Sequence, residues 1–219
     1  MTLKPVSTGA LKTLLYDRWI TENRHIVDSL SGGRVAYVYM KDMGTQSLEK
    51  FLIDMTGIAL GKEALILDIR NNRGGNVHDD VIKFLSQRPY LEWQARNGQR
   101  SPQPHFAPSG GPIILMGNEQ SLSDAEMTAA AFRQLKLGTI VGTETYRWII
   151  FTSGRMLVDG SSTRLPAWGC YDLQGNDLEK TGVKPDIYVR TTFGDMQKGV
   201  DPQLSRAVEE ALKAVGSRQ

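Results

Sequence analysis

The segment SLSDAEM, from Ser121 to Met127, contains a serine whose position suits two different roles. Ser123 and Glu126 have the Ser-x-x-Glu spacing of a capping box, in which the serine hydroxyl accepts a hydrogen bond from a backbone N–H at a helix N-terminus. A serine flanked by free amides at such a terminus is also where an acyl-transfer enzyme places its nucleophile. Ser123 is therefore a candidate helix cap and a candidate catalyst.

A second segment that could take part in chemistry is the turn DIRNNRGGN, from Asp68 to Asn76. Gly74 and Gly75 allow a backbone bend and the close approach of another group. Alone, they are typical of a tight strand-to-helix turn, and the spacing and lysine of a phosphate-binding loop are missing. Together with Ser123, the amides of Gly75 and Asp124 could hold a carbonyl oxygen, and one such oxyanion donor lowers a barrier by roughly 2.7–4 kcal/mol.

Both segments follow apolar runs that are typical of buried parallel strands, at 64–70 and 112–118. Other patterns predict strands at 34–40, 90–96 (an edge strand) and 138–146, antiparallel hairpins over 155–175, and helices at 11–30, 47–60, 77–88, 123–137 and 204–215. Residues 101–111, rich in proline and glycine, are expected to be loop. This alternation predicts an α/β fold with right-handed crossovers, whose site lies at the carboxyl ends of the strands.

The composition narrows the classes of function. The chain has 219 residues, a formal charge of +2 and 40% hydrophobic residues, so a globular protein is expected, with no nucleic-acid or membrane partner. No apolar stretch is long enough to span a bilayer, and the opening residues lack a secretion signal. A single cysteine, Cys170, and three scattered histidines predict no disulfide framework and no metal site.

Four segments in the same order resemble the catalytic core of the carboxy-terminal processing and tricorn-type serine peptidases: ALILDIRNNRGGN, NEQSLSDAEM, GTIVGTETY and TGVKPDI. The resemblance covers about residues 11–215. Residues 16–44 are similar to the tricorn branch, where a comparable helix joins a PDZ domain to the core. The resemblance implies a crotonase/ClpP-like β/α spiral with a C-terminal group of antiparallel strands. Residues 1–12 would then be a linker from an upstream PDZ-like domain, and residues 13–219 the peptidase core.

The resemblance also implies roles for single residues. Ser123 matches the nucleophile, and the amides of Asp124 and Gly75 match the oxyanion donors. Glu179 matches a glutamate of a hydrogen-bonded tetrad that orients the base in the tricorn branch. The reaction implied is peptide-bond hydrolysis through an acyl-enzyme, without cofactor or metal.

The general base is missing from the pattern. The processing branch takes it from a lysine about twenty-five residues after the serine, where this chain has Trp148 and no lysine nearby. The tricorn branch uses a histidine, preceded by a serine, upstream of its PDZ domain. Since a serine without a base is a poor nucleophile, low activity is expected of this chain alone.

Three histidines are candidates to replace that base. His25 is expected on the surface or in helix packing, and His78 as a solvated first-turn residue that is still close enough to Gly75 to be worth testing. His105 lies in the proline-rich loop and could fold over the site.

Substrate selection is left open between two neighbouring residues. Glu92 would favour a basic residue before the cleaved bond, and Trp93 an apolar one. Arg147 and Trp148 stand where the family usually has small residues, so they either narrow the substrate channel or mark a rearranged segment.

Two other functions remain open: a peptide-binding pseudo-enzyme in which Ser123 is only a cap, and a crotonase-type enzyme acting on acyl-CoA. The resemblance implies a peptide or unfolded-protein substrate, upstream PDZ and base-bearing domains, a homo-oligomer, and a bacterial or archaeal cytoplasm.

Overall fold

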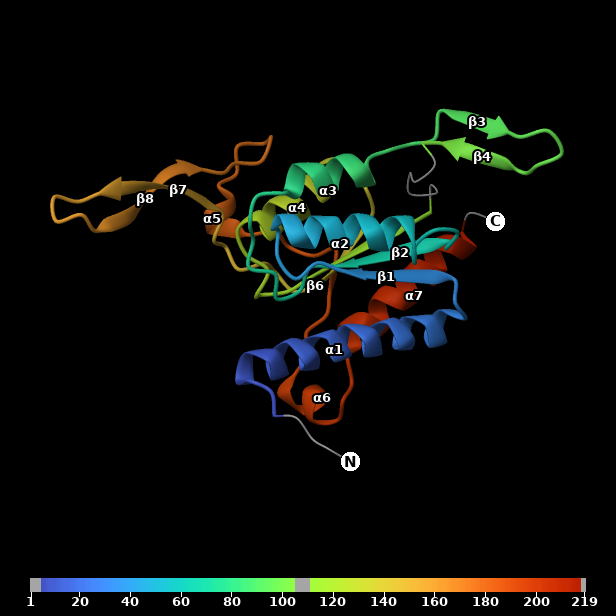
Figure 1. Cartoon of the computed structure of the whole chain (residues 1–219), viewed down its shortest axis with the longest axis horizontal. Helices are drawn as coiled ribbons and strands as arrows, with labels where there is room; N and C mark the ends of the chain where they lie inside the picture. The colour runs from blue at the N-terminus through green and yellow to red at the C-terminus, as the bar shows by residue number, and fades with distance from the viewer. Residues whose placement is uncertain (1–4, 105–110, 218–219) are drawn as a thin grey trace.

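A sheet of five parallel strands forms the centre of the protein (Figure 1). The computed structural model describes residues 5–104 and 111–217. The strand order is β1-β2-β5-β6-β9, with bounds β1 Val35–Tyr39, β2 Ala64–Asp68, β5 Ile113–Gly117, β6 Thr139–Gly142 and β9 Ile187–Tyr188. The parallel α/β architecture expected from the sequence is confirmed. The two-residue strand β9 was not expected.

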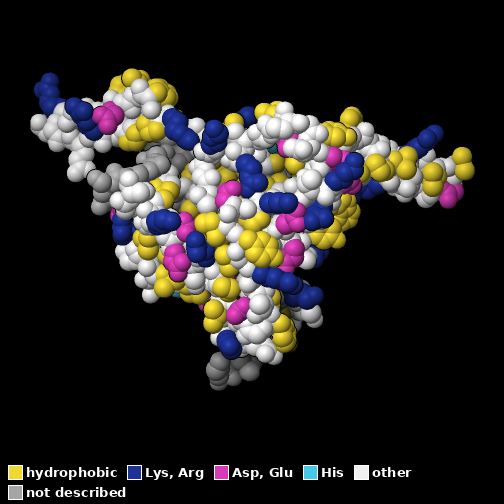
Figure 2. Space-filling model, turned by 180° about the vertical axis from the view of Figure 1, so that it is seen from behind, with side chains coloured by type: hydrophobic (Ala, Val, Ile, Leu, Met, Phe, Trp, Pro, Cys, Tyr) yellow, Lys and Arg dark blue, Asp and Glu magenta, His cyan; other side chains and the backbone are white. Residues whose placement is uncertain are grey.

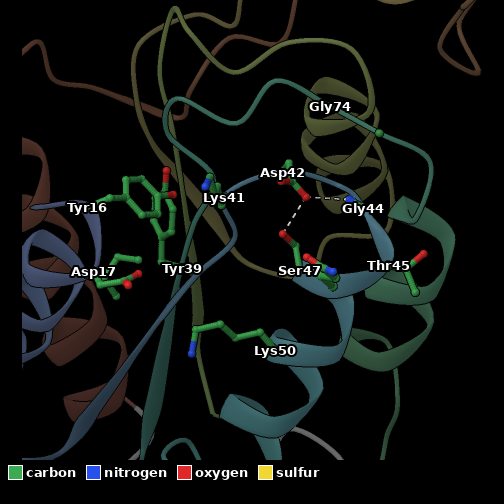
Figure 3. A pocket seen from close by; sticks show the side chains of 13 residues that line it. Tyr16, Asp17, Tyr39, Lys41, Asp42, Gly44, Thr45, Ser47, Lys50 and Gly74 are labelled. Carbon is green, nitrogen blue, oxygen red and sulfur yellow. Dashed lines mark hydrogen bonds between the residues drawn. The ribbon is translucent and has the colours of Figure 1, made fainter. Parts of the chain in front are cut away.

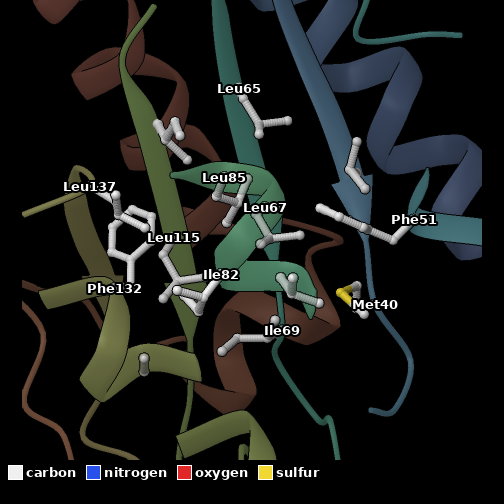
Figure 4. Close-up of a cluster of buried hydrophobic side chains, with 14 of the residues drawn as sticks. Met40, Phe51, Leu65, Leu67, Ile69, Ile82, Leu85, Leu115, Phe132 and Leu137 are labelled. Carbon is white, nitrogen blue, oxygen red and sulfur yellow. The ribbon is translucent and has the colours of Figure 1, made fainter. Parts of the chain in front are cut away.

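Helices cover both faces of this sheet (Figure 1). Helices α2 (Thr45–Thr56), α3 (His78–Leu85) and α4 (Asp124–Gln134) lie on one face, and α1 (Thr8–Ser31) and α7 (Pro202–Gly216) on the other. Every residue of β1, β2 and β5 is buried. Because side chains alternate across a strand, Leu65 and Leu67 enter the core beneath α2–α4 (Figure 4), whereas Ile66 enters the core beneath α1 and α7.

Helix α1 begins earlier than the expected domain boundary. It starts at Thr8, is capped by the Ser7 hydroxyl, which accepts a hydrogen bond from Ala10 N, and ends at Gly32 in the left-handed conformation. Residues 8–12 are continuous with the helix that packs on the sheet, and the assignment of residues 1–12 to a linker stays a prediction.

Two antiparallel hairpins project from opposite ends of the molecule (Figure 1). Strands β7 (Ile150–Met156) and β8 (Ser162–Gly169) form the hairpin expected in the later part of the chain. Strand β3 (Leu91–Gln94) pairs with β4 (Arg100–Gln103) rather than with the edge of the main sheet, so part of the segment expected to be loop is a strand. Both hairpins expose hydrophobic side chains (Figure 2), including Trp93 and Trp168.

Two short helices complete the described structure, α5 (Leu178–Thr181) and α6 (Phe193–Gln197). Over residues 5–104 and 111–217, no helix has the length and apolar character needed to cross a membrane. Within the same residues, no group of three His, Cys, Asp or Glu side chains is arranged to hold a metal ion.

Candidate active site

The two loops expected to form a site lie side by side. They follow β2 and β5, which are neighbouring parallel strands, so their carboxyl ends meet at one edge of the sheet. Asn71 N–H donates to Oδ1 of Asn118 (2.9 Å), and Nδ2 of Asn118 donates to Oδ1 of Asn71 (3.1 Å). Leu122 N–H donates to the Asn72 carbonyl at 3.0 Å. This juxtaposition, predicted from strand order, is confirmed.

Gly74 is the point of closest approach between the loops. Its φ is +83°, and a β-carbon there would lie 2.6 Å from Cβ of Ser123 and 2.9 Å from the Asp124 nitrogen. On the other side, Met43 N–H donates to the Gly74 carbonyl (2.9 Å), and a β-carbon on Gly75 would lie 2.0 Å from the Met43 carbonyl oxygen. The two glycines are therefore held between the β1–α2 connection and Ser123, in a space that admits no side chain.

The backbone of Ser123 has an unusual conformation. Its φ is 57° and its ψ −120°, a region that typically costs about 1–3 kcal/mol for a residue with a side chain. Ser123 is the N-cap of α4 and is placed as in a capping box with Glu126, but its side chain makes no capping hydrogen bond. Instead, Glu126 N–H donates to the Ser123 carbonyl at 2.9 Å. Ser123 thus begins the helix, and no hydrogen bond to its hydroxyl meets normal geometry within the described residues.

Two amides in the loops that meet at Gly74 are candidate oxyanion donors. In the described part of the chain, the Gly75 N–H and the Asp124 N–H have no hydrogen-bond acceptor. The Asp124 N–H belongs to the first turn of α4, where helix amides lack intrahelical partners and the helix dipole favours negative charge. Free donors beside a serine hydroxyl are the groups that stabilise an oxyanion.

The Asp124 carboxylate faces α3. It is buried, and Oδ2 accepts from Val77 N–H (2.8 Å) and from His78 N–H (3.0 Å). Oδ1 lies 2.5 Å from Nδ1 of His78. The adjacent carboxylate of Asp124 raises the pKa of His78 above its ordinary value of 6.5, although partial burial acts in the opposite direction. The expectation of a solvated His78 is wrong, since its side chain is only 18% exposed and paired with Asp124.

Glu126 contributes more than the sequence indicated. Its fully buried carboxylate accepts four hydrogen bonds: Oε1 from Ser123 N–H (3.1 Å) and Trp148 N–H (2.7 Å), and Oε2 from the Thr145 hydroxyl (2.5 Å) and Arg147 N–H (2.8 Å). Glu126 therefore ties the serine turn to segment 145–148. The Ser-x-x-Glu spacing predicted only the bond to Ser123, because the other donors are distant in sequence.

Arg147 and Trp148 present their backbone amides to this carboxylate. The side chain of Arg147 turns to Glu144, with Nη2 2.6 Å from Oε2. Trp148 is half-exposed and lies against Tyr146, with ring centroids 5.9 Å apart. The structure thus gives the segment a backbone role that neither sequence interpretation of these bulky residues included.

Glu179 is exposed on α5, and its carboxylate makes no hydrogen bond or ion pair with any described residue. Its helix is nevertheless linked to the site, because Val183 N–H donates to Oγ1 of Thr145 at 2.8 Å and Thr145 donates to Glu126. The assignment of Glu179 to a tetrad stays a prediction.

The remaining sequence candidates lie apart from the Ser123 turn. Glu92 and Trp93 are on the β3–β4 hairpin, where Glu92 pairs with Arg100 at 3.1 Å and Trp93 is exposed. That hairpin projects at the end opposite β7–β8 (Figure 1), so no contact joins these two residues to Ser123 in the described chain. His25 is exposed on α1, as expected, and His105 lies outside the described residues.

A cavity of about 550 Å³ opens beside Gly74 and Gly75 (Figure 3). Tyr16 and Tyr39 line one side of it, and Nζ of Lys41 lies 5.0 Å from the centroid of the Tyr16 ring. No sequence pattern predicted this cavity, because its walls come from α1, β1 and α2, which are separate in the sequence. It offers room for groups that flank a carbonyl held at the glycine turn.

Comparisons with known proteins agree with this geometry. The model of peptidase family S41 matches residues 34–189. Putative tricorn protease homolog 2 of Streptomyces coelicolor is 36% identical over 207 residues, covering 92% of this chain and 17% of that protein. The tricorn protease of Thermoplasma volcanium is 31% identical, covering 90% of this chain and 19% of that protein.

Among solved structures, the crystal structure of the tricorn protease superposes with a TM-score of 0.83 at 29% identity, over 90% of this chain and 19% of that chain. The photosystem II D1 C-terminal processing protease shares the fold, with a TM-score of 0.57 at 24% identity over 71% of this chain and 42% of that one. The chain spans about a fifth of the length of the tricorn relatives. On the family match and these identities, the chain belongs to peptidase family S41.

Proposed function

We propose that this chain is the catalytic core of a serine peptidase that cleaves peptide bonds through an acyl-enzyme on Ser123. The observation that carries the proposal is the positive-φ serine packed against the Gly74 turn, with the N–H groups of Gly75 and Asp124 free among the described residues. A strained, partly buried nucleophile in a turn that also carries such donors suits attack on a carbonyl. For the detailed fold of the chain, we propose the crotonase-like β/α spiral.

In the proposed reaction, Oγ of Ser123 loses its proton to a general base and forms a bond to the carbonyl carbon of the substrate. The carbonyl oxygen becomes an oxyanion that the Gly75 and Asp124 N–H groups bind. Collapse of this intermediate breaks the C–N bond, and the amine leaves with the proton from the base. Water then attacks the ester, releases the acid and restores the serine hydroxyl.

We further propose that the base comes from a segment preceding residue 1, with Glu179 helping to orient it from α5. The exposed glutamate is available for such a partner. The other proposed partners are peptides or unfolded proteins, an upstream PDZ domain, and further copies of the chain, for which the hydrophobic hairpins offer contact surfaces. The proposed compartment is the cytoplasm.

The test uses the full-length gene product and a fluorophosphonate probe. We expect covalent labelling of one serine, identified as Ser123 by peptide mass, together with hydrolysis of an unstructured protein substrate. Ser123→Ala should lose both, and the control Ser162→Ala, at an exposed position on β8, should lose neither. Folded full-length protein without labelling or hydrolysis contradicts the proposal and favours a pseudo-enzyme.

A further inference from the structure

Asp124 takes part in the site through two different groups. Its backbone N–H is one of the two free donors beside Ser123, and its carboxylate points to α3, where it is buried. The orientation of the amide therefore depends on how firmly the rest of the residue is held. An oxyanion donor is effective only when its direction is fixed before the reaction.

Among the described residues, His78 is the one side chain that forms an ion pair with this carboxylate. Oδ2 of Asp124 is occupied by the amides of Val77 and His78, at 2.8 and 3.0 Å. Oδ1 lies 2.5 Å from Nδ1 of His78, as an ion-pair contact, and neither of these two buried atoms makes a hydrogen bond within the described residues. Without the imidazole, this buried carboxylate oxygen would lose the one ion-pair contact it has among the described residues, which is costly enough to shift the residue.

We propose that His78 is a positioning residue, which fixes the direction of the Asp124 N–H by holding the Asp124 carboxylate against α3. This inference rests on the proposed function, since it concerns the stabilisation of the oxyanion on the Ser123 pathway. His78 does not touch the reacting atoms and acts through Asp124 alone. The family resemblance provides no role for residue 78.

The surroundings of the imidazole favour this arrangement. The carboxylates of Asp124 on α4 and of Asp79 and Asp80 on α3 act on His78, and Nε2 lies 3.6 Å from Oδ1 of Asp79. Asp79 is largely exposed, whereas Asp124 is buried, so solvent screens the first pair far more than the second. His78 is thus directed toward Asp124.

The experiment measures kcat and KM separately in the full-length gene product. His78→Ala should lower kcat about 10- to 100-fold, since a misdirected donor weakens binding of the oxyanion. KM should change less than about twofold, because the oxyanion forms only after substrate is bound. His78→Asn should recover most of kcat, because its amide nitrogen matches the position of Nδ1. The control His25→Ala, exposed on α1, should match the wild type.

The outcomes separate the two proposals. If Ser123 is labelled in the wild type and His78→Ala retains kcat within about twofold, the positioning role is wrong and the peptidase proposal stands. If the wild type shows neither labelling nor hydrolysis, both the peptidase proposal and the positioning role of His78 are contradicted. If His78→Ala does not fold, His78→Asn is compared with His78→Gln, whose amide nitrogen lies one bond further out. Equal kcat in these two folded variants contradicts the inference.

Discussion

The Ser123 N–H donates a hydrogen bond of 3.1 Å to Oε1 of Glu126, whose other oxygen accepts from Thr145 and Arg147. Each carboxylate oxygen therefore faces at least one fixed backbone N–H. A glutamine at this position must turn its NH₂ group toward one of them, which leaves a buried donor without an acceptor. Glu126 is thus the residue that holds the strained serine turn in place.

We expect Glu126→Gln to lower the free energy of unfolding by about 1–3 kcal/mol and to slow fluorophosphonate labelling of Ser123. Urea denaturation and labelling rates at fixed probe concentration measure the two effects. Glu209→Gln, exposed on α7, is the matched control and should change neither. Unchanged stability and labelling in Glu126→Gln would show that the four hydrogen bonds do not hold the serine turn.

Ser123→Ala distinguishes a cap from a nucleophile by its effect on stability. Because the Ser123 side chain makes no capping hydrogen bond, the free energy of unfolding should stay within about 0.5 kcal/mol of the wild type. Loss of a true cap costs about 0.5–2 kcal/mol. Thr192→Ala, which removes a hydroxyl that accepts from Asp195 N–H at 3.2 Å, provides the comparison in the same urea titration. A loss of stability in Ser123→Ala as large as that in Thr192→Ala would support the cap.

The sequence predicts the part of the site that follows from the positions of the strands, which is the meeting of its two loops. Apolar runs at 64–70 and 112–118 predicted neighbouring parallel strands, so the meeting of the Gly74 and Ser123 loops followed from topology. The partners of side chains inside the site were not predictable, because they depend on three-dimensional packing. The first-turn position of His78 predicts a solvated side chain, yet α3 packs against α4 and the imidazole lies against Asp124. Similarly, the donors to Glu126 come from a segment with no helical relation to it.

The close approach of Gly74 to Ser123 can be tested with a matched glycine. Gly74 (φ +83°) and Gly160 (φ +82°) have nearly the same backbone conformation, but a β-carbon on Gly160 would meet nothing within 4 Å. Gly160→Ala should cost only the strain of a left-handed alanine, about 1–2 kcal/mol. Gly74→Ala adds the overlap with Ser123, so it should cost more and abolish Ser123 labelling. Equal stability of both variants in urea, with labelling retained in both, would mean that the loops do not need this contact.

The pairing of His78 with Asp124 predicts how stability depends on pH. The folded protein raises the pKa of His78 above 6.5 through the Asp124 carboxylate, so the folded state binds the proton more tightly than the unfolded state. The stabilisation is therefore fully present below about pH 6.5 and is lost as the pH rises through the higher folded pKa. Hence the stability gap between wild type and His78→Ala should be largest near pH 5.5–6 and narrow toward pH 9. Urea titrations across this range measure the gap, and His25→Ala should show no such trend. A gap that stays constant or widens with rising pH would show that His78 is not held as a cation beside Asp124.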